Sequence, residues 1–193
     1  MARDNSPTIF QAILEAKDIP ADMINVRSFV LRKTLQKQLD EKYGILNTHI
    51  VQISGQTMVY KGMVMSEVLN EFYVDLKNEL YETQFCVYHR RFSTNTLPRW
   101  SLAQPMRFLA HNGEINTYQG NINSAISRED LFNSPKLEGL MDQVKPVLDT
   151  TGSDSYALDN LLELYIESGF SPLKAMMMIM PEAYKGQPAI TDK

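Results

Sequence analysis

The segment between Gln84 and Gly113 constrains the fold more than any other part of the chain. Its apolar residues have the spacing of short strands, and residues Gln84–Phe92 alternate in the manner of a strand. Large apolar side chains occur in both alternating sets, which predicts a strand buried on both faces. A second strand is predicted at Arg107–His111, where the dipeptide Asn112-Gly113, the strongest short turn signal, closes it.

Helices are predicted on both sides of this segment. The first two cover Val26–Lys42 and Glu67–Leu80. A third helix is capped by Ser153 or Asp154 and ends at Gly169. A fourth is capped by Ser171, has Pro172 in its first turn and stops at Pro181. Two short strands, His49–Ile53 and Thr57–Lys61, are predicted around a Ser-Gly-Gln turn. Helices, then strands, then helices indicate a layered α+β domain.

Composition narrows the class of protein. The chain has 193 residues, 44% hydrophobic and 22% charged, as is ordinary for a soluble globular domain. Its net charge of −4, without a basic tract, disfavours nucleic acid and anionic membranes as partners. The longest apolar run, Ala175 to Met180, is far shorter than the ~20 residues of a membrane helix. The N-terminal sequence has no signal-peptide pattern, and the single cysteine favours a reducing compartment. We therefore expect an intracellular protein.

Cysteine and histidine chemistry is disfavoured. In a strand, Cys86 and His89 would lie on opposite faces, which argues against a Cys-His dyad. A thiol without an activating neighbour is a poor nucleophile, and we expect Cys86 to be a small buried hydrophobic residue. The three histidines, His49, His89 and His111, lack metal-ligand spacing, so no metal site is predicted.

A different chemistry is indicated by Arg91, Asn112, Gly113 and Asp154 taken together. A guanidinium can bind an α-carboxylate bidentately, and an aspartate can hold an α-ammonium group. An asparagine amide beside a glycine N–H can form an oxyanion hole for acyl transfer. The residues alone leave two interpretations open: an amino-acid site, or a hairpin turn at Asn112-Gly113 with a helix cap at Asp154.

The stretch "HRRFSTNTLPRWSLAQPMRFLAHNGEINTYQGN", from His89 to Asn121, resembles the class II glutamine amidotransferase domain of glutamate synthases. The segments "VQISGQTMVYKGM", "FYVDL", "GSDSYALDNLLEL" and "MMIMPEAY" also follow the family's order, so the resemblance covers most of the chain from Val26 onward. It implies a four-layer αββα sandwich of the N-terminal-nucleophile hydrolase type, of which residues 1–193 would be an incomplete domain.

The resemblance also implies roles for individual residues. Arg91 would bind the α-carboxylate of L-glutamine with Thr94 nearby, Asn112 and Gly113 would form the oxyanion hole, and Asp154 would hold the α-ammonium group. The family's nucleophile is an N-terminal cysteine, which this sequence lacks, and Cys86 lies elsewhere. We therefore expect the chain alone to be inactive.

In the family's complete enzyme, released ammonia is used to convert 2-oxoglutarate reductively to L-glutamate. The resemblance implies FMN and an iron–sulfur cluster in other domains and no cofactor in this segment. Electrons would come from ferredoxin or NAD(P)H, and the enzyme would be cytoplasmic, or in the plastid stroma of a photosynthetic eukaryote. The alternative is a nucleophile-free module that binds glutamine or contacts a synthase subunit.

Overall fold

The structure, a computed structural model, describes residues 6–43, 48–90, 98–111, 115, 118–150 and 152–180. Its helices are α1 (Ile24–Tyr43), α2 (Leu69–Phe72), α3 (Tyr118–Glu129), α4 (Met141–Val144), α5 (Asp154–Glu167) and α6 (Pro172–Ile179). Short 3-10 turns cover Ala21–Met23, Ser66–Val68, Val74–Lys77, Trp100–Leu102 and Pro135–Leu137. No helix among the described residues is long and apolar enough to cross a membrane.

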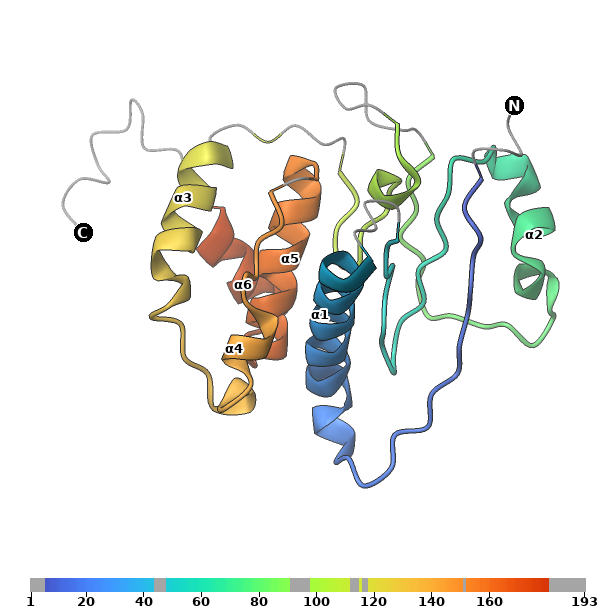
Figure 1. Cartoon of the computed structure of the whole chain (residues 1–193). Helices are drawn as coiled ribbons and strands as arrows, with labels where there is room; N and C mark the ends of the chain where they lie inside the picture. The colour runs from blue at the N-terminus through green and yellow to red at the C-terminus, as the bar shows by residue number, and fades with distance from the viewer. Residues whose placement is uncertain are drawn as a thin grey trace.

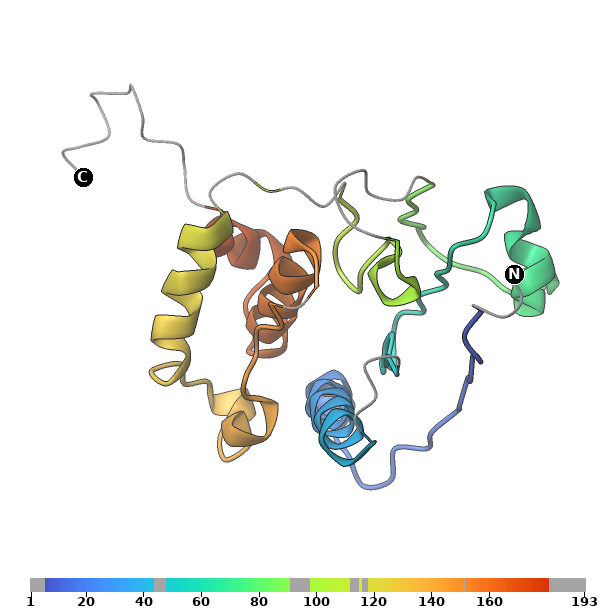
Figure 2. The same ribbon diagram turned by 45° about the horizontal axis from the view of Figure 1, so that its top comes forward.

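Helix α1 divides the molecule into a helical side and an extended side. Helices α3 to α6 lie together on one side of α1, and the extended segment of residues 48–65 lies on the other (Figure 1). Residues 107–109 of a second extended segment are hydrogen-bonded to α5. The turned view keeps this division (Figure 2). One apolar core joins α1 to α4 and α5, with buried side chains from Val26, Phe29, Val30, Leu137, Val144, Val147 and Leu164. A second core joins α5 to α6 through Leu158, Leu162, Ala175 and Ile179.

The helices that rest on local signals were predicted correctly. Helix α1 contains the predicted span Val26–Lys42. The Ser153 hydroxyl accepts a hydrogen bond from the Tyr156 N–H at 3.2 Å and caps α5. After α5, Gly169 has a φ of +100°, a left-handed conformation that favours glycine. Ser171 caps α6 by accepting from the Lys174 N–H at 3.3 Å, while Pro181 lies outside the described residues.

The predicted strands are not formed in the described part of the chain, where no β-ladder occurs. The span Gln84–Phe92, of which residues 84–90 are described, is not buried on both faces: Phe85 is 73% exposed and Tyr88 80%. A strand forms only where a neighbour accepts its backbone hydrogen bonds. Here helix side chains take that role, since the Ile50 N–H donates to Gln36 Oε1 of α1 at 2.9 Å. The α+β sandwich is therefore not seen in these residues.

The predicted helix Glu67–Leu80 is broken into three short pieces: Ser66–Val68, α2 and Val74–Lys77. Tertiary hydrogen bonds overrule its helical periodicity. The Tyr73 hydroxyl donates to the Lys61 carbonyl at 2.7 Å, and the Tyr60 hydroxyl donates to the Asp75 carboxylate. The Ser-Gly-Gln turn is present as a bend, where Ser54 Oγ accepts from the Gln56 N–H at 3.1 Å.

Candidate functional site

The first turn of α5 holds the chain on both sides of the predicted oxyanion segment. Asp154, the first residue of α5, accepts a hydrogen bond through Oδ2 from the Ile115 N–H at 3.0 Å. Gly152, two residues earlier, lets the chain approach the helix closely, because a Cβ there would lie 2.5 Å from the Tyr156 ring. Asp154 therefore lies beside the residue that follows "HNGE" in the sequence.

His111, the residue before Asn112-Gly113, is also tied to this turn. Its Nδ1 lies 3.4 Å from the Ser155 hydroxyl, the second residue of α5. Its backbone N–H donates to Gln104 Oε1 at 3.3 Å. Consecutive residues of α5 thus contact His111 on one side of the predicted segment and Ile115 on the other.

Of the five predicted site residues, the structure describes Asp154, which is half-buried. Arg91, Thr94, Asn112 and Gly113 lie outside the described residues. The predicted meeting of Arg91 and Asp154 stays a prediction. Asp154 lies at the start of α5, as predicted, and is bound to the Ile115 N–H.

One turn further along α5 lies a buried ionic cluster that we call the α5 cluster: Arg32, Arg107, Asp159, Asn160 and Glu163. The Arg107 side chain is 3% exposed and forms ion pairs with Asp159 Oδ2 at 3.0 Å and Glu163 Oε2 at 2.9 Å. It also donates to Asn160 Oδ1 at 3.0 Å. Arg32 of α1 reaches the same Glu163 carboxylate, donating through Nε to Oε1 at 3.3 Å.

The two arginines of the α5 cluster have different electrostatic environments, and their pKa values shift in opposite directions. Burial lowers the pKa of Arg107, but Glu163 and Asp159 outweigh burial and raise it above its usual value. Burial lowers the pKa of Arg32, which has Glu163 as its one carboxylate partner in the cluster and is repelled by Arg107. Two cations and two anions balance in charge, and Arg107 is the cation that both anions share.

Asp159 connects the α5 cluster to the backbone. Its Oδ1 accepts from the N–H groups of Phe108 at 2.7 Å and Leu109 at 3.1 Å, and its Oδ2 accepts from the Arg107 N–H at 3.3 Å. Burial and, less strongly, Glu163 raise the pKa of Asp159, while the Arg107 side chain and the backbone donors of Phe108 and Arg107 oppose that rise. The segment before His111 is therefore held by a side chain of α5 rather than by a neighbouring strand.

Two further basic groups are buried beside the α5 cluster. Burial lowers the pKa of Lys61 to about 8, and its Nζ donates to the Ser101 carbonyl at 2.7 Å. Burial also lowers the pKa of His49 to about 3, with Lys61, Arg107 and Arg32 adding to the effect. The His49 ring packs at 5.8 Å from the ring of Tyr156. We therefore expect a neutral His49 imidazole at neutral pH.

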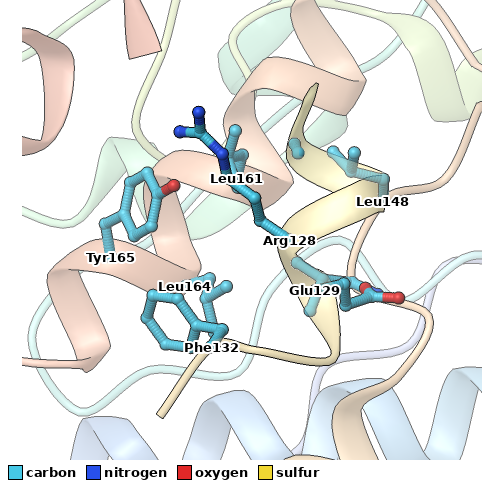
Figure 3. A pocket seen from close by; sticks show the side chains of 9 residues that line it. Arg128, Glu129, Phe132, Leu148, Leu161, Leu164 and Tyr165 are labelled. Carbon is cyan, nitrogen blue, oxygen red and sulfur yellow. The ribbon is translucent and has the colours of Figure 1, made fainter. Parts of the chain in front are cut away.

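Other candidate sites are weaker. Among the described residues, no group of three or more His, Cys, Asp or Glu side chains could hold a metal ion. A depression between α3 and α5 is mostly apolar, with the rings of Phe132 and Tyr165 near Leu164 (Figure 3). Its free space of about 20 Å³ admits little more than one water molecule and is too small for an amino acid. Cys86 is exposed, so its prediction as a buried hydrophobic residue is wrong.

The α5 cluster was missed from the sequence, although a signal for it exists. Ser155, Asp159 and Glu163 recur every four residues in a stretch that is otherwise apolar except for Asn160, and such spacing places them on one face of a helix. Polar residues in line on a buried helix indicate a network that needs partners. The partners Arg32 and Arg107 are remote in sequence and carry no such signal.

Comparison with known proteins decides the family. The family model described as "Glutamine amidotransferases class-II" matches residues 1–193. The chain belongs to this family. Class-II glutamine amidotransferases imply the N-terminal-nucleophile hydrolase fold, although the described residues show no sheet of it.

Similar amidotransferase segments occur in much longer proteins. The chain is 46% identical over 193 residues to "Ferredoxin-dependent glutamate synthase, chloroplastic" of Oryza sativa subsp. japonica, covering 100% of this chain and 12% of that protein. It is 46% identical over 193 residues to "Ferredoxin-dependent glutamate synthase 2" of Synechocystis sp., covering 99% of this chain and 12% of the relative. The chain therefore spans about an eighth of the length of these relatives.

Proposed function

We propose that this chain is the glutamine amidotransferase part of a glutamate synthase. In this role it binds L-glutamine and releases ammonia, which the enzyme uses to convert 2-oxoglutarate reductively to L-glutamate. The observation that carries the proposal is the hydrogen bond from the Ile115 N–H to Asp154, the residue predicted to hold the substrate ammonium group. The similarity to two ferredoxin-dependent glutamate synthases supports the same function.

Each site residue has a distinct role in the proposal. Arg91, with Thr94 nearby, binds the α-carboxylate of glutamine, and Asp154 binds the α-ammonium group. Asn112 and Gly113 donate hydrogen bonds to the oxyanion that develops when the amide carbonyl is attacked. These groups would be held in the αββα sandwich of the family, of which residues 1–193 are a part.

The remaining chemistry is assigned to other parts of the enzyme. FMN and an iron–sulfur cluster would lie in domains outside this segment. Ferredoxin is the electron donor that the names of the relatives favour. Relatives from a plant chloroplast and from Synechocystis fit the plastid stroma or the cytoplasm as the location.

The test uses an intact glutamate synthase that contains this segment, assayed with L-glutamine and with ammonia as nitrogen sources. Arg91→Ala and Asp154→Asn should each weaken glutamine use by at least ~10-fold, since a charge-assisted contact contributes about 1.5–3 kcal/mol. Ammonia bypasses the pocket, so ammonia-dependent glutamate formation should be unchanged. Asn112→Ala should lower kcat for glutamine more than it raises KM, because its amide acts on charge that develops in the transition state.

The Asp154→Asn substitution separates charge from structure. The asparagine oxygen can still accept from the Ile115 N–H, so the variant removes the negative charge and keeps the hydrogen bond. Asp142→Asn is the matched control, because Asp142 is a 96% exposed carboxylate on α4. Equal losses with glutamine and with ammonia would show that the residues only hold the fold. Glutamine binding without hydrolysis by the intact protein would favour a nucleophile-free binding module instead.

A further inference from the structure

The path of the chain into the oxyanion segment is set by one carboxylate. Asp159 is fully buried and accepts hydrogen bonds from the backbone N–H groups of three successive residues, Arg107, Phe108 and Leu109. The Arg107 side chain folds back onto Asp159 Oδ2 at 3.0 Å. Both carboxylate oxygens are thus used, and the segment is fixed at three consecutive peptide groups.

This fixed segment leads directly to the proposed catalytic groups. Leu109 precedes His111 by two positions, and Asn112 and Gly113 follow His111. Asp159 lies four residues beyond Ser155 on α5, about 6 Å along the helix axis. Helix α5 therefore binds this part of the chain at three points: Leu109 through Asp159, His111 through Ser155 and Ile115 through Asp154.

Such a clamp suits an oxyanion hole. Donors stabilise a developing oxyanion only when they are held in place before the reaction, and a shift of about 0.5 Å reduces the effect. The backbone bonds from residues 107–109 require an acceptor on both Asp159 oxygens, which an ionised carboxylate provides. Arg107 pairs with that carboxylate inside the protein and opposes the rise in its pKa that burial causes.

We propose that Asp159 is a positioning residue for glutamine hydrolysis: by binding the backbone of Arg107–Leu109, it fixes the chain segment that precedes Asn112 and Gly113, the proposed oxyanion donors. Asp159 acts through the backbone and does not touch the substrate. The proposal rests on the proposed function, because it concerns the rate of the same reaction.

The test is Asp159→Asn in the intact glutamate synthase that contains this segment. The asparagine has nearly the same shape but replaces one acceptor oxygen by an NH2 group, which faces the Arg107 N–H and ends the ion pair. We expect kcat for glutamine to fall at least ~10-fold, KM for glutamine to change less than about 3-fold, and ammonia-dependent turnover to stay unchanged.

The network control is Arg32→Met. This change removes one member of the α5 cluster that has no bond to the backbone of residues 107–109. We expect it to lower the melting temperature while kcat, measured well below that temperature, stays within 2-fold of the wild-type value. Positioning predicts that the two variants differ in kcat, whereas a purely structural role predicts that their kcat values follow their stabilities.

Binding resolves the case in which Asp159→Asn has no measurable turnover. Calorimetric binding of L-glutamine that remains near wild-type strength supports positioning, because the pocket is then intact. Lost binding, a KM that rises as much as kcat falls, or an unchanged kcat overturns the proposal. A wild-type enzyme that neither binds nor uses glutamine would instead reject the proposed function itself, so the two failures are distinct.

Discussion

Replacing Arg107 should destabilise the fold far more than replacing Arg32, although both arginines are buried in the same cluster. Arg107 is bound by Asp159, Asn160 and Glu163, whereas Arg32 is bound by Glu163. Arg107→Met leaves the fully buried Asp159 carboxylate without its cation. Removing one partner of a buried ion pair typically costs about 3–5 kcal/mol.

Arg32→Met leaves the buried carboxylates in a different state from Arg107→Met. Glu163 keeps Arg107 as a partner at 2.9 Å, so neither buried carboxylate loses its last cation. The wild-type Arg32 is itself held at a cost, since burial and the repulsion of Arg107 lower its pKa. Methionine fills a similar apolar space beside Phe29. We expect a loss of about 1–2 kcal/mol, which is smaller than the loss expected for Arg107→Met.

Equilibrium urea unfolding at pH 7, followed by far-ultraviolet circular dichroism, measures both losses. The two variants should have the wild-type m-value, so that differences in midpoint report stability. Glu163→Gln combined with Arg32→Met completes a double-mutant cycle, with an expected coupling of about 1–3 kcal/mol. If Arg32→Met were as damaging as Arg107→Met, the central role of Arg107 in the α5 cluster would be refuted.

Two further predictions concern pH. Burial lowers the pKa of His49 to about 3, so the folded state keeps its imidazole neutral. The contribution of His49 to the free energy of unfolding should be complete above about pH 6.5 and fall by up to ~1.4 kcal/mol per pH unit as the pH drops toward 3. Urea titrations of His49→Asn should lack this slope. Burial raises the pKa of Glu167 to about 7, so the folded state favours its protonated form, and this contribution is complete below about pH 4.5 and lost as the pH rises through 7. Glu167→Gln should therefore raise the unfolding free energy at pH 8 by about 1 kcal/mol, after allowance for solvent screening at this partly exposed site, and change it little at pH 4.5. A stabilisation that is equal at both pH values would contradict the assignment to Glu167.

The accuracy of sequence-based prediction follows the range of the interactions. The start and end of α5 and the start of α6 depend on residues within four positions, namely Ser153, Gly169 and Ser171, and these were predicted correctly. The strands depend on partners elsewhere in the chain, which alternation alone does not name. The segment of residues 107–109 has strand-like spacing, but its backbone N–H groups are bound by Asp159, fifty or more positions away.

For the candidate site, too, residues in a local motif were predicted from the sequence and residues brought together by the fold were missed. Asp154 was proposed because it lies at a helix start within a motif; the structure shows it bound to the Ile115 N–H, and its role in binding substrate stays a prediction. Arg32 and Arg107 were missed because they come from α1 and from an extended segment, and only the folded chain brings them to α5.

Helix α5 carries both apolar residues that pack into the cores and a row of buried polar residues. Leu158, Leu162 and Leu164 supply the cores on its other faces, so the helix is held in place without the α5 cluster. Apolar residues in place of the two carboxylates of α5 and their two arginine partners would avoid the desolvation of four charged groups, and such replacements are often neutral or stabilising. They would, however, leave the N–H groups of Arg107, Phe108 and Leu109 without their acceptor, and a buried donor left unpaired costs about 1–3 kcal/mol. The arginines then follow from the carboxylates, because buried anions require cations. The charged face of α5 is therefore best explained by the one path that it imposes on the chain before His111.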